Sequence, residues 1–148
     1  MSKINRANFV FAFEFGKVRD AFMRAEILID DKVYTVPCEW SGDVGQGTVQ
    51  VPVTLPSKLI ISLSGKGPND TLVDDQGNIT QDCYAKLTDV YIDSFRLSHD
   101  HFLHKKIILQ TENGQAINTS YFGFNGTVQM DLDKNSVFSQ YCALNRPQ

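Results

Sequence analysis

The chain has 148 residues, of which 42% are hydrophobic and 21% are charged, and it carries a formal net charge of −3. These values predict a single soluble globular domain, large enough to bury a core without disulfide or metal staples. They argue against a nucleic-acid partner, which needs a concentrated basic face, and no stretch is long and apolar enough to span a membrane.

The cysteines and the N-terminus indicate where the chain is made. Cys38, Cys83 and Cys142 are odd in number, far apart and outside any C-x-x-C pair, which argues against a zinc site and a disulfide framework. Buried free thiols are the plainer interpretation. The N-terminus has no apolar signal-peptide core, so we expect synthesis in a cytoplasm without secretion.

Alternating apolar residues predict strands through the first half of the chain. The predicted ranges are 7–15, 22–29, 32–36, 48–55 and 58–64. The first range has four phenylalanines on one face and predicts a half-buried strand with an aromatic inner surface. Pro52 lacks an amide donor, so we expect its strand at an edge or at a bulge. The glycine-rich segment 40–47 is predicted to be a connecting loop.

The second half predicts further hairpins, one long strand and a final helix. Strands are predicted over 71–73, 79–81, 84–93, 105–111, 116–122 and 127–132. The alternation within 84–93 is imperfect, which indicates either apolar cover on both faces or a β-bulge. Asn-Gly pairs at 113–114 and 125–126 predict tight turns between strands. Helical spacing of apolar residues after residue 135 predicts a short C-terminal helix.

Nine or more short strands, joined mostly by hairpins, are typical of an antiparallel β-sandwich or jelly roll. We therefore expect an all-β fold, an antiparallel β-sandwich or jelly roll with a short C-terminal helix. A length of 148 residues suits one domain and leaves little room for two, so we expect residues 1–148 to form a single domain.

The segment 65–93 joins two predicted strands through the densest run of turn-forming and acidic residues in the chain. Calcium prefers six to eight oxygen ligands, and one such loop system can supply several of them. The candidate ligands are Asp70, Asp74, Asp75, Asn78 and Asp82. The spacing differs from that of an EF-hand loop. Because Asp and Asn are also ordinary turn residues, a solvated crossover loop is the alternative to a calcium site.

A second candidate site combines aromatic and polar residues that suit a sugar ring. The apolar faces of pyranose rings pack on aromatic side chains, while neighbouring amides and carboxylates bind the hydroxyls. The candidate ligand-binding residues are Trp40, Tyr121, Phe124 and Asn125. The alternative is that these aromatic side chains belong to the core, as most do in a β-sandwich.

Signals for an enzyme are weaker. His99, His101 and His104 lie close together, and a His-x-His pair can bind a transition metal. A cupin-type site also needs a nearby glutamate and a distant histidine, which the chain does not offer at suitable positions. No G-x-S-x-G elbow marks a serine hydrolase, and nothing selects a pair of carboxylates for glycoside hydrolysis. The expected function is therefore non-catalytic.

Two phrases in the chain carry a resemblance to a known group of proteins. They are SGKGPNDTLVDDQGNITQDCYAKLTDVYID and TSYFGFNGTVQMDL. Both resemble small β-sandwich proteins encoded by tailed bacteriophages, which are similar in layout to calcium-dependent carbohydrate-binding modules. The resemblance covers residues 58–132. It implies a jelly-roll-like sandwich, glycan binding and a place on the virion.

The residues and the resemblance together favour a protein like a carbohydrate-binding module, associated with a phage virion. Its expected partners are a glycan or other virion subunits. The alternative is a purely structural virion component, such as a head decoration, tail or baseplate protein, acting through subunit contacts. Specific sugar binding by the isolated domain favours the first role, whereas homo-oligomerisation or binding only to assembled particles favours the second.

Overall fold

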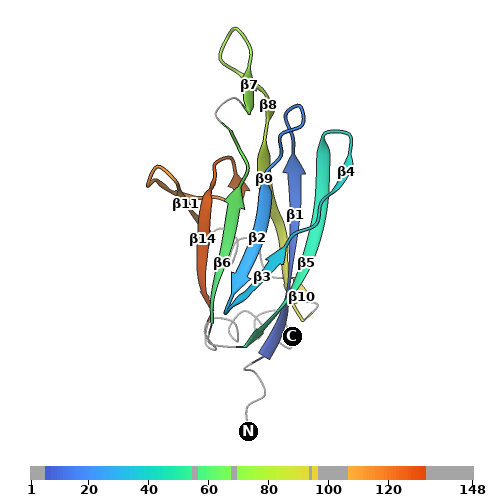
Figure 1. Ribbon diagram of the computed structural model, residues 1–148, viewed down its shortest axis with the longest axis vertical. Coiled ribbons are helices and arrows are strands. Elements are labelled where there is room, and N and C mark those ends of the chain that lie inside the picture. Colours follow the sequence, from blue (N-terminus) through green and yellow to red (C-terminus); the bar gives the residue numbers. More distant parts are fainter. Residues whose placement is uncertain (1–5, 55–56, 68–69, 94, 97–106, 133–148) are drawn as a thin grey trace, which may run out of the picture.

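The structure is a computed structural model of the chain, and it describes residues 6–54, 57–67, 70–93, 95–96 and 107–132. These residues form two six-stranded antiparallel sheets and a separate two-stranded hairpin (Figure 1). No helix occurs among them. The predicted all-β, antiparallel class is therefore confirmed for the described part of the chain.

Sheet 1 has the strand order β10-β9-β1-β5-β4, and β13 also pairs with β9. Its strands are β1 (Arg6–Gly16), β4 (Glu39–Ser41), β5 (Val44–Thr54), β9 (Tyr84–Ile92), β10 (Phe95–Arg96) and β13 (Tyr121–Phe122). Sheet 2 has the order β12-β11-β14-β6-β2-β3. Its strands are β2 (Arg24–Ile29), β3 (Lys32–Thr35), β6 (Ser57–Ser64), β11 (Ile108–Thr111), β12 (Ala116–Asn118) and β14 (Gly126–Leu132).

The hairpin of β7 (Thr71–Val73) and β8 (Ile79–Asp82) projects beyond the ends of both sheets (Figure 1). It lies within the acidic segment 65–93, which the sequence indicates as a candidate calcium site. An isolated two-stranded hairpin is marginally stable in water. Contacts at its base with the sheets are therefore needed to hold it in place.

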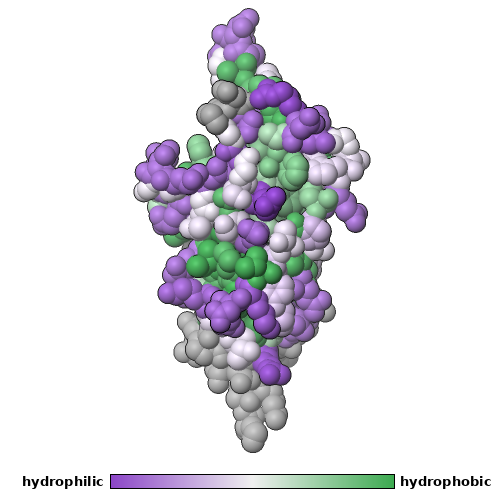
Figure 2. Space-filling model, in the orientation of Figure 1, coloured by the Kyte–Doolittle hydropathy of each residue, from purple (hydrophilic) through white to green (hydrophobic). Residues whose placement is uncertain are grey.

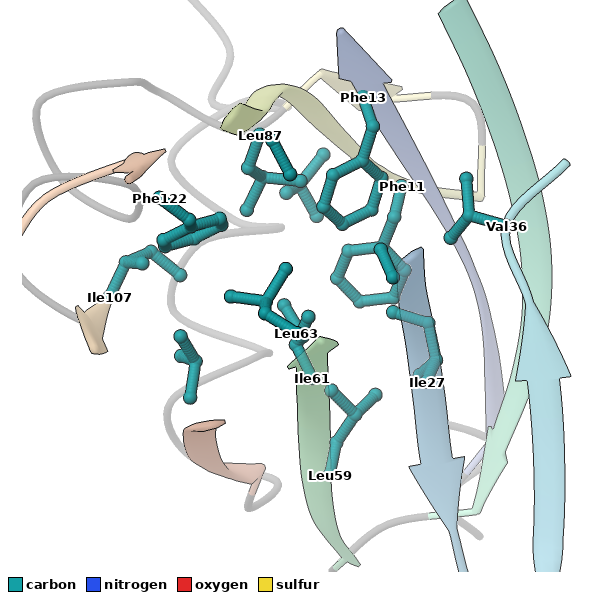
Figure 3. Packing of buried hydrophobic residues seen from close by; sticks show 14 of the residues in the cluster. Phe11, Phe13, Ile27, Val36, Leu59, Ile61, Leu63, Leu87, Ile107 and Phe122 are labelled. Carbon is teal, nitrogen blue, oxygen red and sulfur yellow. The ribbon is translucent and has the colours of Figure 1, made fainter. Parts of the chain in front are cut away.

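The inner faces of the two sheets share one hydrophobic core. The four alternating phenylalanines of β1 are at most 2% exposed. Figure 3 shows Phe11 and Phe13 reaching from β1 toward Ile27 and Leu63 of sheet 2. The predicted aromatic inner surface of β1 is confirmed, and the two packed sheets have the layout of a β-sandwich.

The imperfect alternation of β9 has a local cause. Its register with β1 shifts between Ala12 and Phe13, so that Thr88 is an additional residue on β9. The Thr88 hydroxyl donates to the Ala12 carbonyl at 3.1 Å. Leu87 and Val90 consequently both reach the core, with exposed fractions of 0% and 1%. The imperfect alternation of residues 84–93 therefore reflects a β-bulge and not apolar cover on both faces.

The prediction of a connecting loop over residues 40–47 is wrong. β4 and β5 form a hairpin there, with Gly42 at a φ of +65°, a left-handed conformation that suits glycine. Glycines replace the alternating apolar residues in this segment, so periodicity could not show the strands.

Pro52 lies further along β5, beyond the part that pairs with β4. The pairing of β4 with β5 ends at Gln46, so Pro52 has a partner strand on one side only, where it pairs with Asn8 of β1. The expected edge position of Pro52 is therefore correct locally.

The prediction of one strand over residues 116–122 is also wrong. β12 pairs with β11 in sheet 2, whereas β13 pairs with β9 in sheet 1. Thr119 lies between the two strands, and its hydroxyl accepts a local hydrogen bond from the Tyr121 N–H at 3.0 Å. The pair at 125–126 is likewise no hairpin turn, since the strand before it lies in sheet 1 and β14 lies in sheet 2.

Several predictions fall on residues that the structure does not describe. The segment predicted to form a C-terminal helix falls in this part of the chain, as do His99, His101 and His104. Among the described residues, Cys38 and Cys83 are free thiols, but only Cys83 is buried as expected, and Cys38 is half-buried. Within the same residues, no helix has the length and apolar character needed to cross a bilayer.

Candidate functional site

Three of the four predicted ligand-binding residues meet at the base of the β7–β8 hairpin. Tyr121 belongs to β13, and Phe124 and Asn125 follow it in the link to β14. Tyr121 and Phe124 are 41% and 52% exposed, and both line an open pocket of about 410 Å³. Ile79 of β8 and Ile117 of β12 add apolar wall to the same pocket. The pocket therefore lies between both sheets and the projecting hairpin.

A partly buried ion pair forms the polar side of this pocket. Lys66 Nζ lies 2.6 Å from Asp82 Oδ1, and each side chain is only 12% exposed. The ammonium also donates to the Gly123 carbonyl at 2.7 Å. Asp82 accepts the hydroxyl of Thr71 at 2.6 Å and that of Tyr121 at 2.5 Å. One carboxylate therefore ties the base of the hairpin to β13 and to the loop that contains Lys66.

These contacts control the protonation of the site. Burial raises the pKa of Asp82, but hydrogen bonds from Lys66, Thr71 and Tyr121 outweigh it and hold the pKa below its ordinary value of 3.8. Burial and the hydrogen bond to Asp82 raise the pKa of Tyr121. Near neutral pH, Asp82 is therefore a carboxylate and Tyr121 is a neutral hydroxyl that donates to it.

Asn125 holds the main chain of Lys66. Its Oδ1 accepts from the Lys66 N–H at 3.0 Å, and its Nδ2 donates to the Lys66 carbonyl at 2.8 Å. Asn125 also lines a neighbouring pocket of about 420 Å³, which shares Lys66 and Phe124 with the first. In the structure Asn125 is thus a positioning residue for Lys66, and its predicted contact with a ligand stays a prediction.

Tyr84 connects the pocket to the outer face of sheet 1. Its ring stacks on Tyr121 with centroids 4.8 Å apart, and its hydroxyl donates to Glu14 Oε2 at 2.5 Å. Burial and the hydrogen bond to Glu14 raise the pKa of Tyr84 to about 12. Gly16 permits this arrangement, because a Cβ at that position would overlap the Tyr84 ring. The stacked pair is therefore held at both ends by carboxylates.

Trp40 lies away from this pocket. It belongs to β4, which β1 and β5 separate from β9 and β13 in sheet 1. The Trp40 ring packs edge-on against Phe22 with centroids 5.5 Å apart, and Lys17 Nζ lies 4.9 Å from its centroid. The structure does not bring Trp40 to Tyr121, so a ligand contact of Trp40 would belong to another surface.

The five predicted calcium ligands have different local roles. Asp74 accepts the Asn78 N–H at 2.9 Å and closes the hairpin turn, and this hydrogen bond lowers the pKa of Asp74. Asp75 is exposed, Asp70 lies at the base of the hairpin and Asp82 is paired with Lys66. Among the described residues, no three His, Cys, Asp or Glu side chains are placed to hold one metal ion. Because Asp74 and Asp82 hold other partners, calcium, which prefers six to eight oxygen ligands, would have to displace them, and it stays a prediction.

Sequence reasoning missed Lys66 and did not select Tyr84 from the other aromatic residues, although both organise the site. Lys66 stands between two glycines just before the acidic run, and that charge complement is a signal for an ion pair. Tyr84 has no such signal, because it looks like any tyrosine at the start of a strand. Its role depends on Gly16, which is opposite it across β1 and β9.

Comparisons with known proteins add one distant similarity. No family model and no curated protein matches the chain. A solved structure described as vCBM60, from work on two families of calcium-dependent carbohydrate-binding modules, is similar over 85% of this chain and 90% of its own. The identity is 8% and the TM-score is 0.47. A similarity at this level assigns neither a family nor a ligand to this chain.

Proposed function

We propose that the protein is a non-catalytic recognition module that binds a glycan in the pocket lined by Tyr121 and Phe124. One observation carries the proposal: two exposed aromatic side chains and a partly buried ion pair face the same open pocket. An aromatic ring packs against the apolar face of a pyranose, and polar groups beside it bind the hydroxyls.

Lys66 is the hydrogen-bond donor that we assign to the ligand. An ammonium group has three donors, and Asp82 and Gly123 take two of them. The Lys66 ammonium also lies 5.9 Å from the centroid of the Phe124 ring. A sugar stacked on Phe124 would therefore place a hydroxyl oxygen near the third donor. Because Asp82 balances the charge of Lys66, this pocket suits a neutral sugar.

Phe124→Ala tests the pocket. It is expected to weaken binding by about fivefold, since one lost aromatic contact is worth about 1 kcal/mol. The measurement is isothermal titration with the oligosaccharide that binds best on a glycan array. Phe22→Ala is the matched control, because Phe22 is also an exposed phenylalanine, at 46%, and packs on Trp40. Equal affinities for the two variants would contradict the assignment of the pocket.

Calcium at the β7–β8 hairpin remains part of the proposal as a separate, testable step. Binding would require carboxylates such as Asp74 to exchange their present hydrogen bonds for the metal. Calcium at a hundred times its dissociation constant would add about 2.7 kcal/mol of stability, a shift of several degrees in the unfolding midpoint. A rise that EDTA reverses and Asp75→Ala abolishes would support the site, and an unchanged midpoint would contradict it.

A second candidate function is a purely structural role through subunit contacts. Cross-strand pairing places Val33, Leu28 and Ile60 in one row on the outer face of sheet 2, and Figure 2 shows an apolar patch over β2 and β6. Exposed apolar patches mark interaction surfaces. Sedimentation velocity of the wild type and of Ile60→Lys tests this role: an oligomer that the substitution dissociates would support it.

The phage origin and the virion location rest on the resemblance of the two sequence phrases, and both belong to the proposal. Co-sedimentation with assembled particles tests them. Binding to particles that lack surface glycan would favour the structural role, whereas competition by free oligosaccharide would favour glycan recognition.

A further inference from the structure

A row of directly paired residues crosses the outer face of sheet 1. In strand order from β13 to β4, the row contains Tyr121, Lys86, Glu14, Gln46 and Glu39. Paired residues on neighbouring strands point to the same side of a sheet. Since the residues that flank Glu14 and Tyr121 on β1 and β13 are buried in the core, the row faces away from the core. Four strand spacings of about 4.8 Å make it about 19 Å long.

A groove lies along part of this row. It has a volume of about 450 Å³, and Glu14, Gln46 and Glu39 line it. The next residue along the same face of β1 is Ala12, which also lines the groove and pairs with Asp89 and Thr48. A small side chain at the centre, between longer polar ones, is what leaves the face hollow.

Side-chain contacts join this groove to the aromatic pocket without a break. Glu14 accepts the hydroxyl of Tyr84, and the Tyr84 ring stacks on Tyr121. Tyr121 lines the aromatic pocket and donates to Asp82. The stacked tyrosines therefore form a bridge between the two depressions, and Tyr121 belongs both to the row and to the pocket.

The acidic side chains of the groove favour uncharged polymers over anionic ones. Glu14 and Glu39 line it together with Asp89, and Lys86 is the basic member of the row. Like charge repels an anionic chain such as a nucleic acid or a uronate polymer. Gln46 and Thr48 offer both donors and acceptors to hydroxyl groups. The lining therefore suits an uncharged polyhydroxylated chain.

We infer that the glycan is an extended, uncharged chain, with one ring on the Tyr121–Phe124 pocket and the following rings in the groove over Ala12. This inference rests on the proposed function and adds to it the groove as a second subsite and the chain length as a determinant of affinity. A single ring fills only the pocket. A chain of several rings also covers the row along sheet 1.

Ala12→Phe tests the inference, because it fills the groove from an outer-face position that leaves the core unchanged. Binding is measured by isothermal titration with cello-, xylo- and manno-hexasaccharides, with the matching disaccharides and with anionic oligogalacturonides. The wild type is expected to bind one neutral hexasaccharide at least about tenfold more tightly than its disaccharide, a difference of about 1.4 kcal/mol. Ala12→Phe is expected to remove this gain and to leave the disaccharide affinity unchanged.

Val10→Phe is the matched control. Val10 lies on the same face of β1, next to Ala12 in the alternation, and is not among the residues that line the groove. It is expected to keep the gain with chain length. Three results would overturn the inference but not the proposed pocket. They are equal wild-type affinity for disaccharide and hexasaccharide, tighter hexasaccharide binding that survives in Ala12→Phe, and preferred binding of oligogalacturonide. Failure of the folded wild type to bind every oligosaccharide in the panel would overturn the proposed function and this extension together.

Discussion

Asp82→Ala is expected to lower the free energy of unfolding by about 2–3 kcal/mol. Removing one partner of a fully buried ion pair costs about 3–5 kcal/mol, and the residual exposure of this pair reduces that cost. The substitution leaves Lys66 partly buried without its counter-ion and takes away the acceptor of Thr71 and Tyr121. Urea unfolding at pH 7 measures the loss.

The pH dependence of this loss has a definite sign. The pKa of Asp82 is lower in the folded protein than its ordinary value of 3.8. Its stabilising contribution is therefore present above pH 4 and disappears as the pH falls through the folded-state pKa. The difference in stability between wild type and Asp82→Ala should shrink in acid. A difference that stays constant from pH 7 to pH 2 would contradict the assigned ion pair.

A double variant separates the ion pair from simple packing. Lys66→Met combined with Asp82→Leu removes both charges and keeps similar volumes. Replacing both partners of a buried pair by apolar residues is often nearly neutral, so the double variant should be more stable than Asp82→Ala. Glycan binding should still be weaker than in the wild type, because the Lys66 donor is lost. Recovered stability with lost binding would show that Lys66 contacts the glycan. Recovery of both stability and binding would show that the ion pair only supports the fold.

Phe11→Ala is expected to have the largest effect on stability, about 3–5 kcal/mol. Phe11 is 0% exposed and stacks on Phe9 with centroids 6.0 Å apart at the centre of the core. A loss of this size is a large part of the 5–15 kcal/mol that typically stabilises a domain. The measurement is the denaturant midpoint at constant m-value.

Phe124→Ala is the matched control for this loss, because it deletes the same side chain at a position that is 52% exposed. It should cost less than about 1 kcal/mol, as surface substitutions usually do. Equal losses at the two positions would mean that the inner face of β1 is assigned incorrectly.

Much of the candidate site followed from residue chemistry. The mixture of aromatic and polar residues around Tyr121 and Phe124 predicts a sugar platform, and the structure places both side chains at one pocket. Trp40 satisfied the same chemical criterion but lies on a strand of sheet 1 that is remote from β13. Chemistry alone cannot distinguish these cases, because the strand order of a sheet is not a property of any local segment.

The acidic crossover shows the same limit. Its carboxylates predicted either a metal site or turn chemistry, and Asp74 does close the hairpin turn. Asp82 instead pairs with Lys66, sixteen residues earlier in the chain, and thereby organises the pocket. The sequence shows both charges, but not that the fold brings them to 2.6 Å.

The sequence by itself determined the class of the fold and the composition of its inner faces. Period-two alternation decides which side chains of a strand are buried, and β1 has the predicted aromatic face. The irregularity of β9 is also visible as a break in alternation, although that break alone does not distinguish a bulge from apolar cover on both faces. These features are local, because each depends only on a residue and its neighbours along one strand.

Only the tertiary structure decided how the site is assembled. Strands β12 and β13 are close in sequence but lie in different sheets, and that crossing brings Tyr121 against Tyr84 and Asp82. The row from Tyr121 to Glu39 likewise exists only because five strands pair in a particular register. Register and strand order follow from the packing of the whole core, in which many contacts between distant segments are satisfied together, and no short stretch of sequence contains that information.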